Sequence, residues 1–265
     1  MTLPTYEVYA VKYGEHDRNA ASNFLGGDPH DGPMPMDYFV WVLRRGTDVV
    51  VVDAGFNERS AQERGRRLVR SVPQALRLLD IDVATVPDVI LTHMHYDHIG
   101  CIDAFPSARF HLQDLEMAYA TGRHMAHHVF RDAFDLPDVL TLVEQTYKGR
   151  VRYYDGDADF APGISPHLVG GHTRGLQIVR VRTERGWVVL ASDATHFYRN
   201  MREERPFPII FNIGDMLEGY RRLEDLADTP DHIVPGHDPL VLKRYPPPAE
   251  SLRGTAASLH VWPQG

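Results

Sequence analysis

Cysteine is nearly absent from this chain of 265 residues, which has Cys101 as its one cysteine. An intrachain disulfide is therefore excluded, and so is a zinc site built from several cysteines. Basic residues are also in the minority, since 28 Lys and Arg stand against 36 Asp and Glu, a formal net charge of −8. Because binding to a phosphate backbone needs clustered Lys and Arg, no nucleic-acid partner is expected.

Long apolar runs are missing as well. The longest, such as residues 49–52, are far shorter than the ~20 residues that a membrane span needs, so no membrane association is expected. The N-terminal residues are charged and mixed, without the basic and apolar regions of a signal peptide. We therefore expect a cytoplasmic protein with one domain over residues 1–265. The sequence leaves the oligomeric state open, a homodimer included.

Apolar patterning predicts short strands that alternate with helices. A helix is expected over 58–79, kinked or split at Pro73, and others over 114–120 and 215–227. The stretch at about 113–148 predicts a helical insert above a core rather than a separate domain. Strands are expected at 7–12, 38–43, 49–53, 88–92, 108–112, 151–154, 177–182, 187–192 and 232–234.

The histidine-rich segment HMHYDH at residues 93–98 directly follows the buried strand predicted at 88–92. In an extended chain, side chains at i, i+2 and i+4 share one side, so His93, His95 and Asp97 are expected to converge. A turn at Asp97 and His98 would let these two face a second point a few ångströms away. The pattern therefore predicts two neighbouring metal sites.

Further polar residues follow predicted strands or lie in glycine-rich turns. Asp53 follows the apolar run 49–52, His172 lies in GGHT, Asp193 comes at the end of the strand 187–192, and His237 lies in PGHD. Sites in α/β sheets gather at the carboxyl ends of strands, so these side chains are expected near residues 93–98. We interpret Asp53 as a residue that orients a ligand rather than binding a metal itself.

This set of motifs resembles the metallo-β-lactamase superfamily over roughly residues 38–240, with VDAG at 52–55 matching an early strand-end motif of that family. The resemblance implies an α/β (α+β) fold, a four-layer αββα sandwich with the metals at one edge. It also implies how the ligands divide. One metal would be held by His93, His95 and His172, the other by Asp97, His98 and His237, and Asp193 would bridge both.

Within the superfamily, the complete ligand set looks like the N-acyl-homoserine lactone lactonases and the glyoxalase II thioesterases. True β-lactamases generally lack the bridging aspartate, and flavodiiron proteins carry Glu at the position of His95. Well-known lactonases have a Tyr three residues after the bridging Asp, whereas this chain has His196 there and Tyr198 two residues later. Asp97, His196 and Tyr198 are the candidate catalytic residues.

The resemblance implies a hydrolase with two divalent metal ions, Zn²⁺ being the expected pair. A metal-bridging hydroxide would open a lactone, an N-acyl-homoserine lactone or a related γ-lactone, which is quorum-quenching chemistry. The alternatives are another catabolic lactone or a thioesterase of the glyoxalase II type, although little chain follows His237. A nuclease is disfavoured by the acidic charge, and a non-enzymatic scaffold by the complete ligand set.

Several residues keep two interpretations. His196 is either a substrate contact or a polar residue at a helix start, and for Tyr198 packing is slightly preferred. His124, His127 and His128 are interpreted as a lid or a solvated helix face. For the apolar residues 207–211, core packing is preferred over binding of an acyl chain.

Overall fold

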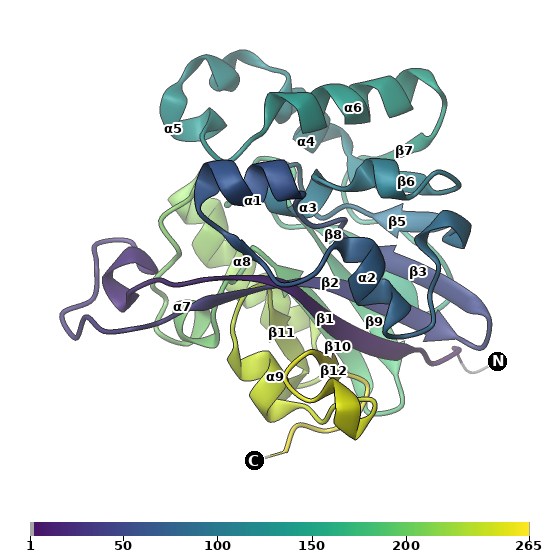
Figure 1. Cartoon of the computed structure of the whole chain (residues 1–265). Coiled ribbons are helices and arrows are strands. Elements are labelled where there is room, and N and C mark those ends of the chain that lie inside the picture. The colour runs from purple at the N-terminus through teal and green to yellow at the C-terminus, as the bar shows by residue number, and fades with distance from the viewer. Residues whose placement is uncertain (1–2, 265) are drawn as a thin grey trace.

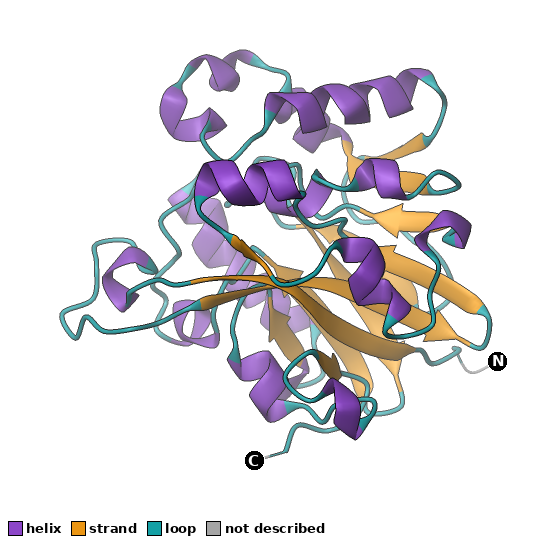
Figure 2. Ribbon diagram, viewed as in Figure 1, coloured by secondary structure: helices purple, strands orange, loops and turns teal. Residues whose placement is uncertain are grey.

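Two β-sheets form the centre of the computed structural model, which describes residues 3–264 (Figures 1 and 2). The larger sheet has the order β12-β1-β2-β3-β5-β6-β7, with β4 pairing on β1, and the smaller has the order β11-β10-β9-β8. Strands of the larger sheet are β1 (Glu7–His16), β2 (Met36–Arg45), β3 (Asp48–Val52), β4 (Arg67–Leu68), β5 (Asp88–Ile90), β6 (Arg109–Gln113), β7 (Val151–Tyr154) and β12 (Ala256–Ser258). Those of the smaller are β8 (Ile164–Leu168), β9 (Gln177–Thr183), β10 (Gly186–Ser192) and β11 (Ile233–Pro235).

Each sheet is covered on both faces, which produces the expected four layers. Side chains alternate between the two faces of a strand, and in β2 both sets are buried. This double burial explains why β2 is apolar along nearly its whole length. The set facing the outer helices is Tyr38, Val40 and Val42, and the set facing the smaller sheet is Phe39, Trp41 and Leu43.

Helices cover the outer faces of the two sheets (Figure 2). On the smaller sheet, Met216, Tyr220 and Leu223 of α8 (Ile213–Leu226) lie one or two turns apart and pack on β10. None of the helices within residues 3–264 combines the length and the apolar character needed to cross a membrane. The larger sheet is covered by α1 (Glu58–Arg64), α2 (Val72–Arg77), α3 (Tyr96–Ile99), α4 (Asp114–Ala120) and α6 (Leu136–Tyr147).

The helix expected over 58–79 is split, but the predicted position of the split at Pro73 is wrong, because the chain forms α1, the short strand β4 and then α2. Gly65 ends α1 with φ 63°, a left-handed conformation that glycine adopts without strain. Ser71 caps α2 through the backbone N–H of Gln74. Pro73 lies in the first turn of α2, where its missing N–H costs no helical hydrogen bond, so it begins a helix instead of breaking one.

The other predicted strands and helices are present, α4 and β7 with the predicted bounds and the rest with shifted ends, and the stretch between β6 and β7 is helical through α4, α5 (His128–Arg131) and α6. Six strands and α-helices were not predicted: β4, β8, β12, α3, α7 (Tyr198–Arg202) and α9 (Leu240–Arg244). The strand β8 is an edge strand that contains Pro166, and its alternation of apolar and polar residues is weak. The other five span only two to five residues, too short for periodicity to reveal.

Strand direction brings the site together. The strands β3, β5, β6 and β7 run parallel, and so do β10 and β11 of the smaller sheet. Parallel strands end at the same edge of a sheet, so the loops after β3, β5, β10 and β11 gather at one end of the sandwich. These loops contain Asp53, residues 93–98, Asp193 and His237.

Asp138, in the first turn of α6, is a buried carboxyl group whose burial should affect the stability of the protein. Its side chain is buried, and its Oδ2 has no hydrogen-bond partner among the described residues. Burial, and after it the nearby Asp135, raises the pKa of Asp138 from 3.8 to about 7. A carboxyl whose pKa is raised by folding binds a proton in the folded state, so its contribution to stability is lost as the pH rises through this range.

Asp138→Asn should therefore make the protein more stable at pH 8, by at least about 1 kcal/mol, and should change little at pH 4. Urea unfolding at both pH values measures this. Glu144→Gln, an exposed change on the same helix, serves as the control. An equal effect of Asp138→Asn at both pH values would contradict the interpretation.

Candidate metal centre

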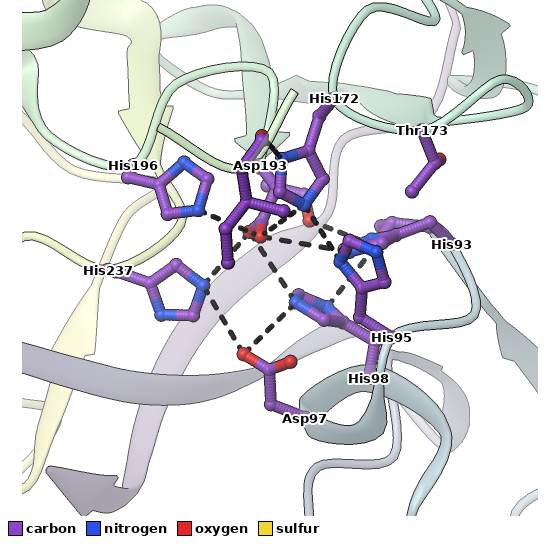
Figure 3. Close-up of polar contacts among 12 residues, drawn as sticks. His93, His95, Asp97, His98, His172, Thr173, Asp193, His196 and His237 are labelled. Atoms are coloured by element: carbon purple, nitrogen blue, oxygen red, sulfur yellow. Dashed lines mark hydrogen bonds and ion pairs between the residues drawn. The ribbon is translucent and has the colours of Figure 1, made fainter. Parts of the chain in front are cut away.

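Seven predicted ligand side chains meet at the strand ends (Figure 3). All seven are buried, although they come from segments up to 144 positions apart in sequence, as His93 and His237 are. Their ligand atoms form two neighbouring groups within which every pair lies no more than 4.8 Å apart. The first group is His93, His95, His172 and Asp193, and the second is Asp97, His98 and His237.

In the first group, ring nitrogens point at one another. The Nε2 of His93 lies 3.0 Å from the Nδ1 of His95, and the Nε2 of His172 lies 2.9 Å from the same atom. The Oδ2 of Asp193 lies 3.1 Å from the Nε2 of His172 and 3.7 Å from the Nε2 of His93. Lone pairs that face each other at such distances repel unless a proton or a cation lies between them.

In the second group, the Oδ2 of Asp97 lies 3.6 Å from the Nε2 of His98 and 3.8 Å from the Nε2 of His237. The Oδ1 of Asp193 lies 2.9 Å from the Nε2 of His237 and 3.4 Å from that of His98. The two oxygens of Asp193 therefore face different groups, Oδ2 the first and Oδ1 the second. Asp193 is the one side chain that joins the two groups through separate atoms.

The loop after β5 separates His93 and His95 from Asp97. The chain is still extended at His95, whose φ is −67° and ψ 155°, and α3 begins at Tyr96. Extended spacing therefore puts His93 and His95 on one side as predicted, but the expectation that Asp97 joins them is wrong, because the helix turns it toward His98 and His237. This grouping is the one that the family resemblance implies.

Hydrogen bonds to the outer ring nitrogens fix how the histidines face the centre. The Nδ1 of His172 lies 2.7 Å from the carbonyl oxygen of Ile209, and the Nδ1 of His237 lies 3.0 Å from that of Asp37. A carbonyl oxygen only accepts, so each Nδ1 carries the proton and each Nε2 presents a lone pair to the cluster. The tautomer needed for metal binding is thus set by the backbone.

Beneath the ligands, a buried polar network connects the two sheets. The hydroxyl of Thr92 donates to Asp53 Oδ2 at 2.9 Å and lies 2.9 Å from the hydroxyl of Ser192, at the end of β10. The Oδ2 of Asp53 also lies 2.7 Å from the Nδ1 of His98, the contact that a residue orienting this imidazole would make. Asp53 and Ser192 have φ values of 64° and 45°, a left-handed conformation that is strained in residues other than glycine and persists where the surroundings impose it.

The electrostatics of the cluster favour added positive charge. Burial raises the pKa of Asp193, but the rings of His196 and His237 outweigh this effect and hold the pKa well below its ordinary value. Burial lowers the pKa of His98, yet Asp53 and Asp97 raise it well above its ordinary value. Burial and the adjacent His98 hold the pKa of His93 far below its ordinary value, so its ring is neutral at pH 7. Neutral imidazoles beside ionised carboxylates are the form that metals bind.

The donor set fits divalent metal ions. The Nε2 of His98 is buried and has no hydrogen-bond partner within residues 3–264, although it faces the centre of the second group. Imidazole nitrogens and carboxylate oxygens together suit Zn²⁺ and also Mn, Fe or Co. The aspartate between the two groups suits a pair of ions.

The structure brings His196 to the cluster but not Tyr198. The Nε2 of His196 lies 3.1 Å from Asp193 Oδ2, and its ring stacks on Phe207 at 3.8 Å between centroids. Tyr198 is the first residue of α7, so its side chain turns back into the core between the sheets. Its ring lies 4.8 Å from the guanidinium of Arg244, which agrees with packing rather than with contact to a substrate.

An aromatic cluster lies beside the first group of ligands. The ring of Phe134 is 4.7 Å from that of His95, and Tyr119 lies 5.7 Å from Phe134. His124 packs on this cluster, 5.1 Å from Phe211, whereas His127 and His128 are exposed. Of the apolar residues 207–211, Phe207 and Phe211 pack inside, while Ile209 is 42% exposed.

Sequence reasoning missed Glu116 of α4, a fully buried carboxylate that connects two of the ligand loops. Its Oε1 accepts from the backbone N–H of Met94, between His93 and His95, at 2.9 Å. Its Oε2 accepts from the Thr173 hydroxyl at 2.7 Å and from the Gly175 N–H at 2.9 Å. A glutamate in a short helix carries no sequence signal of burial, so only the packing of α4 on the loops identifies it.

Glu116→Ala should destabilise the protein by at least about 3 kcal/mol, because three buried donors lose their acceptor. Glu116→Gln should recover part of this loss, since one oxygen remains and the amide N–H₂ opposes a backbone N–H. The free energy of unfolding in urea measures both, with the exposed Glu184→Gln as control. If all three variants unfold alike, Glu116 does not hold the loops together.

Comparison with known proteins identifies a family and several similar proteins. The family profile described as the Metallo-beta-lactamase superfamily matches residues 34–242. The N-acyl homoserine lactonase AttM of Azorhizobium caulinodans is 31% identical over 171 residues, which cover 62% of this chain and 62% of AttM. A crystal structure of a quorum-quenching N-acyl homoserine lactone lactonase superposes with a TM-score of 0.73 at 21% identity, over 89% of this chain and 94% of that chain. That of AidC, a dizinc quorum-quenching lactonase, superposes with a TM-score of 0.70 at 15% identity, over 89% of each chain.

The two solved structures show that this chain, with its two sheets between outer layers of helices, shares their fold. The chain spans about three fifths of the length of AttM, so that match covers part of each protein. The profile, in contrast, covers most of the chain and includes all seven residues of the cluster. The chain belongs to the metallo-beta-lactamase superfamily.

Proposed function

We propose that this protein is a metal-dependent hydrolase that opens a lactone ring and uses two divalent cations, with Zn²⁺ the expected pair. The observation that supports this most strongly is the position of Asp193, whose two oxygens face two separate groups of ligand atoms. A carboxylate shared in this way is typical of two-metal hydrolytic sites, in which the ions lie roughly 3.5–4 Å apart. His93, His95 and His172 would hold one ion, and Asp97, His98 and His237 the other.

The choice of a lactone as substrate is supported by the relatives. AttM is an N-acyl homoserine lactonase, and AidC is described as a dizinc quorum-quenching lactonase. An N-acyl-homoserine lactone or a related γ-lactone is therefore the proposed substrate class. A small lactone needs no basic groove or large interface, which agrees with an acidic chain.

When bound, the two cations lower the pKa of a water molecule and polarise the substrate carbonyl. The residues of this chain then have distinct roles. Asp193 fixes the position of the first group of ligands relative to the second. The backbone carbonyls of Ile209 and Asp37 accept from the rings of His172 and His237 and so hold them in the required tautomer.

Asp97 is the proposed proton carrier. At 8% it is the most exposed of the seven ligands, and its Oδ1 makes no hydrogen bond or ion pair within residues 3–264. This free oxygen can take the proton of the attacking water and return it to the ring oxygen once the C–O bond of the lactone breaks. The product is one hydroxy acid, so the elements of water are fully accounted for.

His196 stands at the sequence position of the family's tyrosine, and its proposed role is to orient the bridging Asp193. Burial, opposed by Asp193, lowers the pKa of His196 to about 3, so the ring is neutral. Its Nε2 faces Asp193, and its Nδ1 is buried without a partner in the described part of the chain. A neutral ring that donates from Nε2 to Asp193 keeps only a lone pair on Nδ1, so it can hold the carboxylate but cannot donate to the substrate carbonyl.

The substrate class is tested with a panel of γ-lactones of graded acyl length, compared with glutathione thioesters. We expect proton release from the lactones, with kcat/KM at least about tenfold above that for any thioester. The zinc-loaded protein is the enzyme, and zinc salt without protein is the control. Brisk thioester hydrolysis without lactone turnover would contradict the proposal and favour a thioesterase.

Asp193→Asn tests the two-ion site independently of the substrate. The amide keeps the shape but removes the charge that two cations would share, so we expect loss of metal and at least about a hundredfold loss of kcat. Metal content by atomic emission and thermal unfolding with and without chelator measure the effect. Because metal bound only by the folded state stabilises it, chelation should lower the Tm of the parent more than that of the variant. Equal metal content and activity in both proteins would refute the bridging role.

A further inference from the structure

Two guanidinium groups and an imidazole gather beside the second group of ligands and are called here the cationic cluster: His16, Arg18 and Arg66. His16 ends β1 and pairs with Met36 of β2. The next residue of β2, Asp37, accepts the hydrogen bond of His237 through its backbone carbonyl. The cluster therefore lies at the strand ends that carry the metal centre, where the segment between β1 and β2 extends to the left of Figure 1.

Arg66 is connected to the centre through two tyrosines. Its Nε donates to the hydroxyl of Tyr96 at 3.0 Å, and that hydroxyl lies 3.3 Å from the hydroxyl of Tyr38. The ring of Tyr38 is in turn 5.1 Å from the ring of His237. Both tyrosines are buried, whereas Arg66 is half-buried, so Arg66 lies at the outer end of this row.

Arg18 approaches the same centre through an aromatic ring. Its guanidinium carbon lies 5.0 Å from the centroid of Phe207, the ring on which His196 stacks at 3.8 Å. His196 contacts Asp193, so one aromatic ring and one imidazole separate Arg18 from the aspartate that faces both groups of ligands. Two separate rows of contacting side chains thus connect Arg18 and Arg66 to the metal centre.

Neither guanidinium has a carboxylate partner within residues 3–264, in a chain where acidic residues outnumber basic ones. Arg18 donates to the Asn23 side chain and the Ser22 carbonyl, and Arg66 to Tyr96 and the Arg64 carbonyl, all of which are neutral acceptors. Arg64, by contrast, pairs with Asp135. Half-buried charges without partners are unfavourable, so a site that keeps two of them favours an anion from outside.

His16 offers a third free donor. The Nη1 of Arg66 lies 3.1 Å from its Nε2, which must accept, so the proton is on Nδ1. This Nδ1 is buried and has no partner among the described residues. Burial, and after it Arg66 and Arg18, lowers the pKa of His16 to about 4, so the ring is neutral at pH 7. A cavity of about 550 Å³ borders His16 and Arg18, together with Asn19, Pro35 and the exposed carboxylate of Asp17.

We propose that the cationic cluster binds a carboxylate carried by the substrate, so that the natural lactone is an acid rather than a neutral acyl amide. This inference rests on the proposed hydrolase function, because it places the carboxylate beside the ester that the metal centre cleaves. Guanidinium forks bind carboxylates through paired N–H groups, and the Nη1 of Arg18 and the Nη2 of Arg66 make no hydrogen bond within residues 3–264.

The test compares a γ-butyrolactone that carries a ring carboxylate with the matching carboxamide. The zinc-loaded parent should prefer the carboxylate in kcat/KM by about 10- to 100-fold, the range of hydrogen bonds to charged groups. Arg18→Gln and Arg66→Gln should each reduce this ratio, and Arg66→Lys should restore part of it. Arg77→Gln, an exposed arginine of α2, is the matched control and should leave the ratio unchanged.

Binding separates this inference from the hydrolase proposal. Cyclopentanecarboxylate and cyclopentanecarboxamide are not hydrolysed, and calorimetry should show tighter binding of the acid, lost in both Gln variants. Such a result without lactone turnover would support the cationic cluster and refute the proposed lactone hydrolysis. Equal kcat/KM for the two lactones, or a preference for acid that survives both substitutions because the anion binds the metals instead, would overturn the inference.

Discussion

The electrostatic conflict among seven buried ligand side chains is the constraint on which the rest of the structure depends. Ring nitrogens of His95, His93 and His172 face one another at 2.9–3.0 Å, an arrangement that is repulsive without positive charge between them. The protein keeps this arrangement by connecting the loops from behind. Glu116 holds two loops of the first group, and the network of Asp53, Thr92 and Ser192 connects the two sheets under the second. Asp53 and Ser192 have a left-handed backbone conformation in this connection, and the strain of that conformation costs folding free energy.

The meeting of the seven side chains could be predicted because each member follows an apolar strand or lies in a glycine-rich turn, and parallel strands end at one edge. The HMHYDH segment is compact enough to be recognised as it stands. What spacing alone could not decide was the partner of Asp97, since that depends on α3 beginning at Tyr96, a helix of only four residues. Local helix boundaries are the weakest part of any reading of a single sequence.

Residues that act through packing were harder to predict. Tyr198 and His196 are two positions apart, yet only His196 reaches the cluster, because α7 begins at Tyr198 and turns its ring into the core. Glu116, Arg18 and Arg66 have no motif, and their roles follow from contacts with residues that are 22 to 189 positions away, such as Met94 and Phe207. The four layers themselves were predicted from the family resemblance, whereas the division of residues 58–79 depended on capping by Gly65 and Ser71.

The most direct test of the two-ion site is the position of metal in crystals of the zinc-loaded protein, located by anomalous scattering at the zinc edge. We expect two peaks about 3.5–4 Å apart, one beside His93, His95 and His172, the other beside Asp97, His98 and His237, with Asp193 between them. A single peak, or none at these residues in a folded and active protein, would contradict the two-ion site.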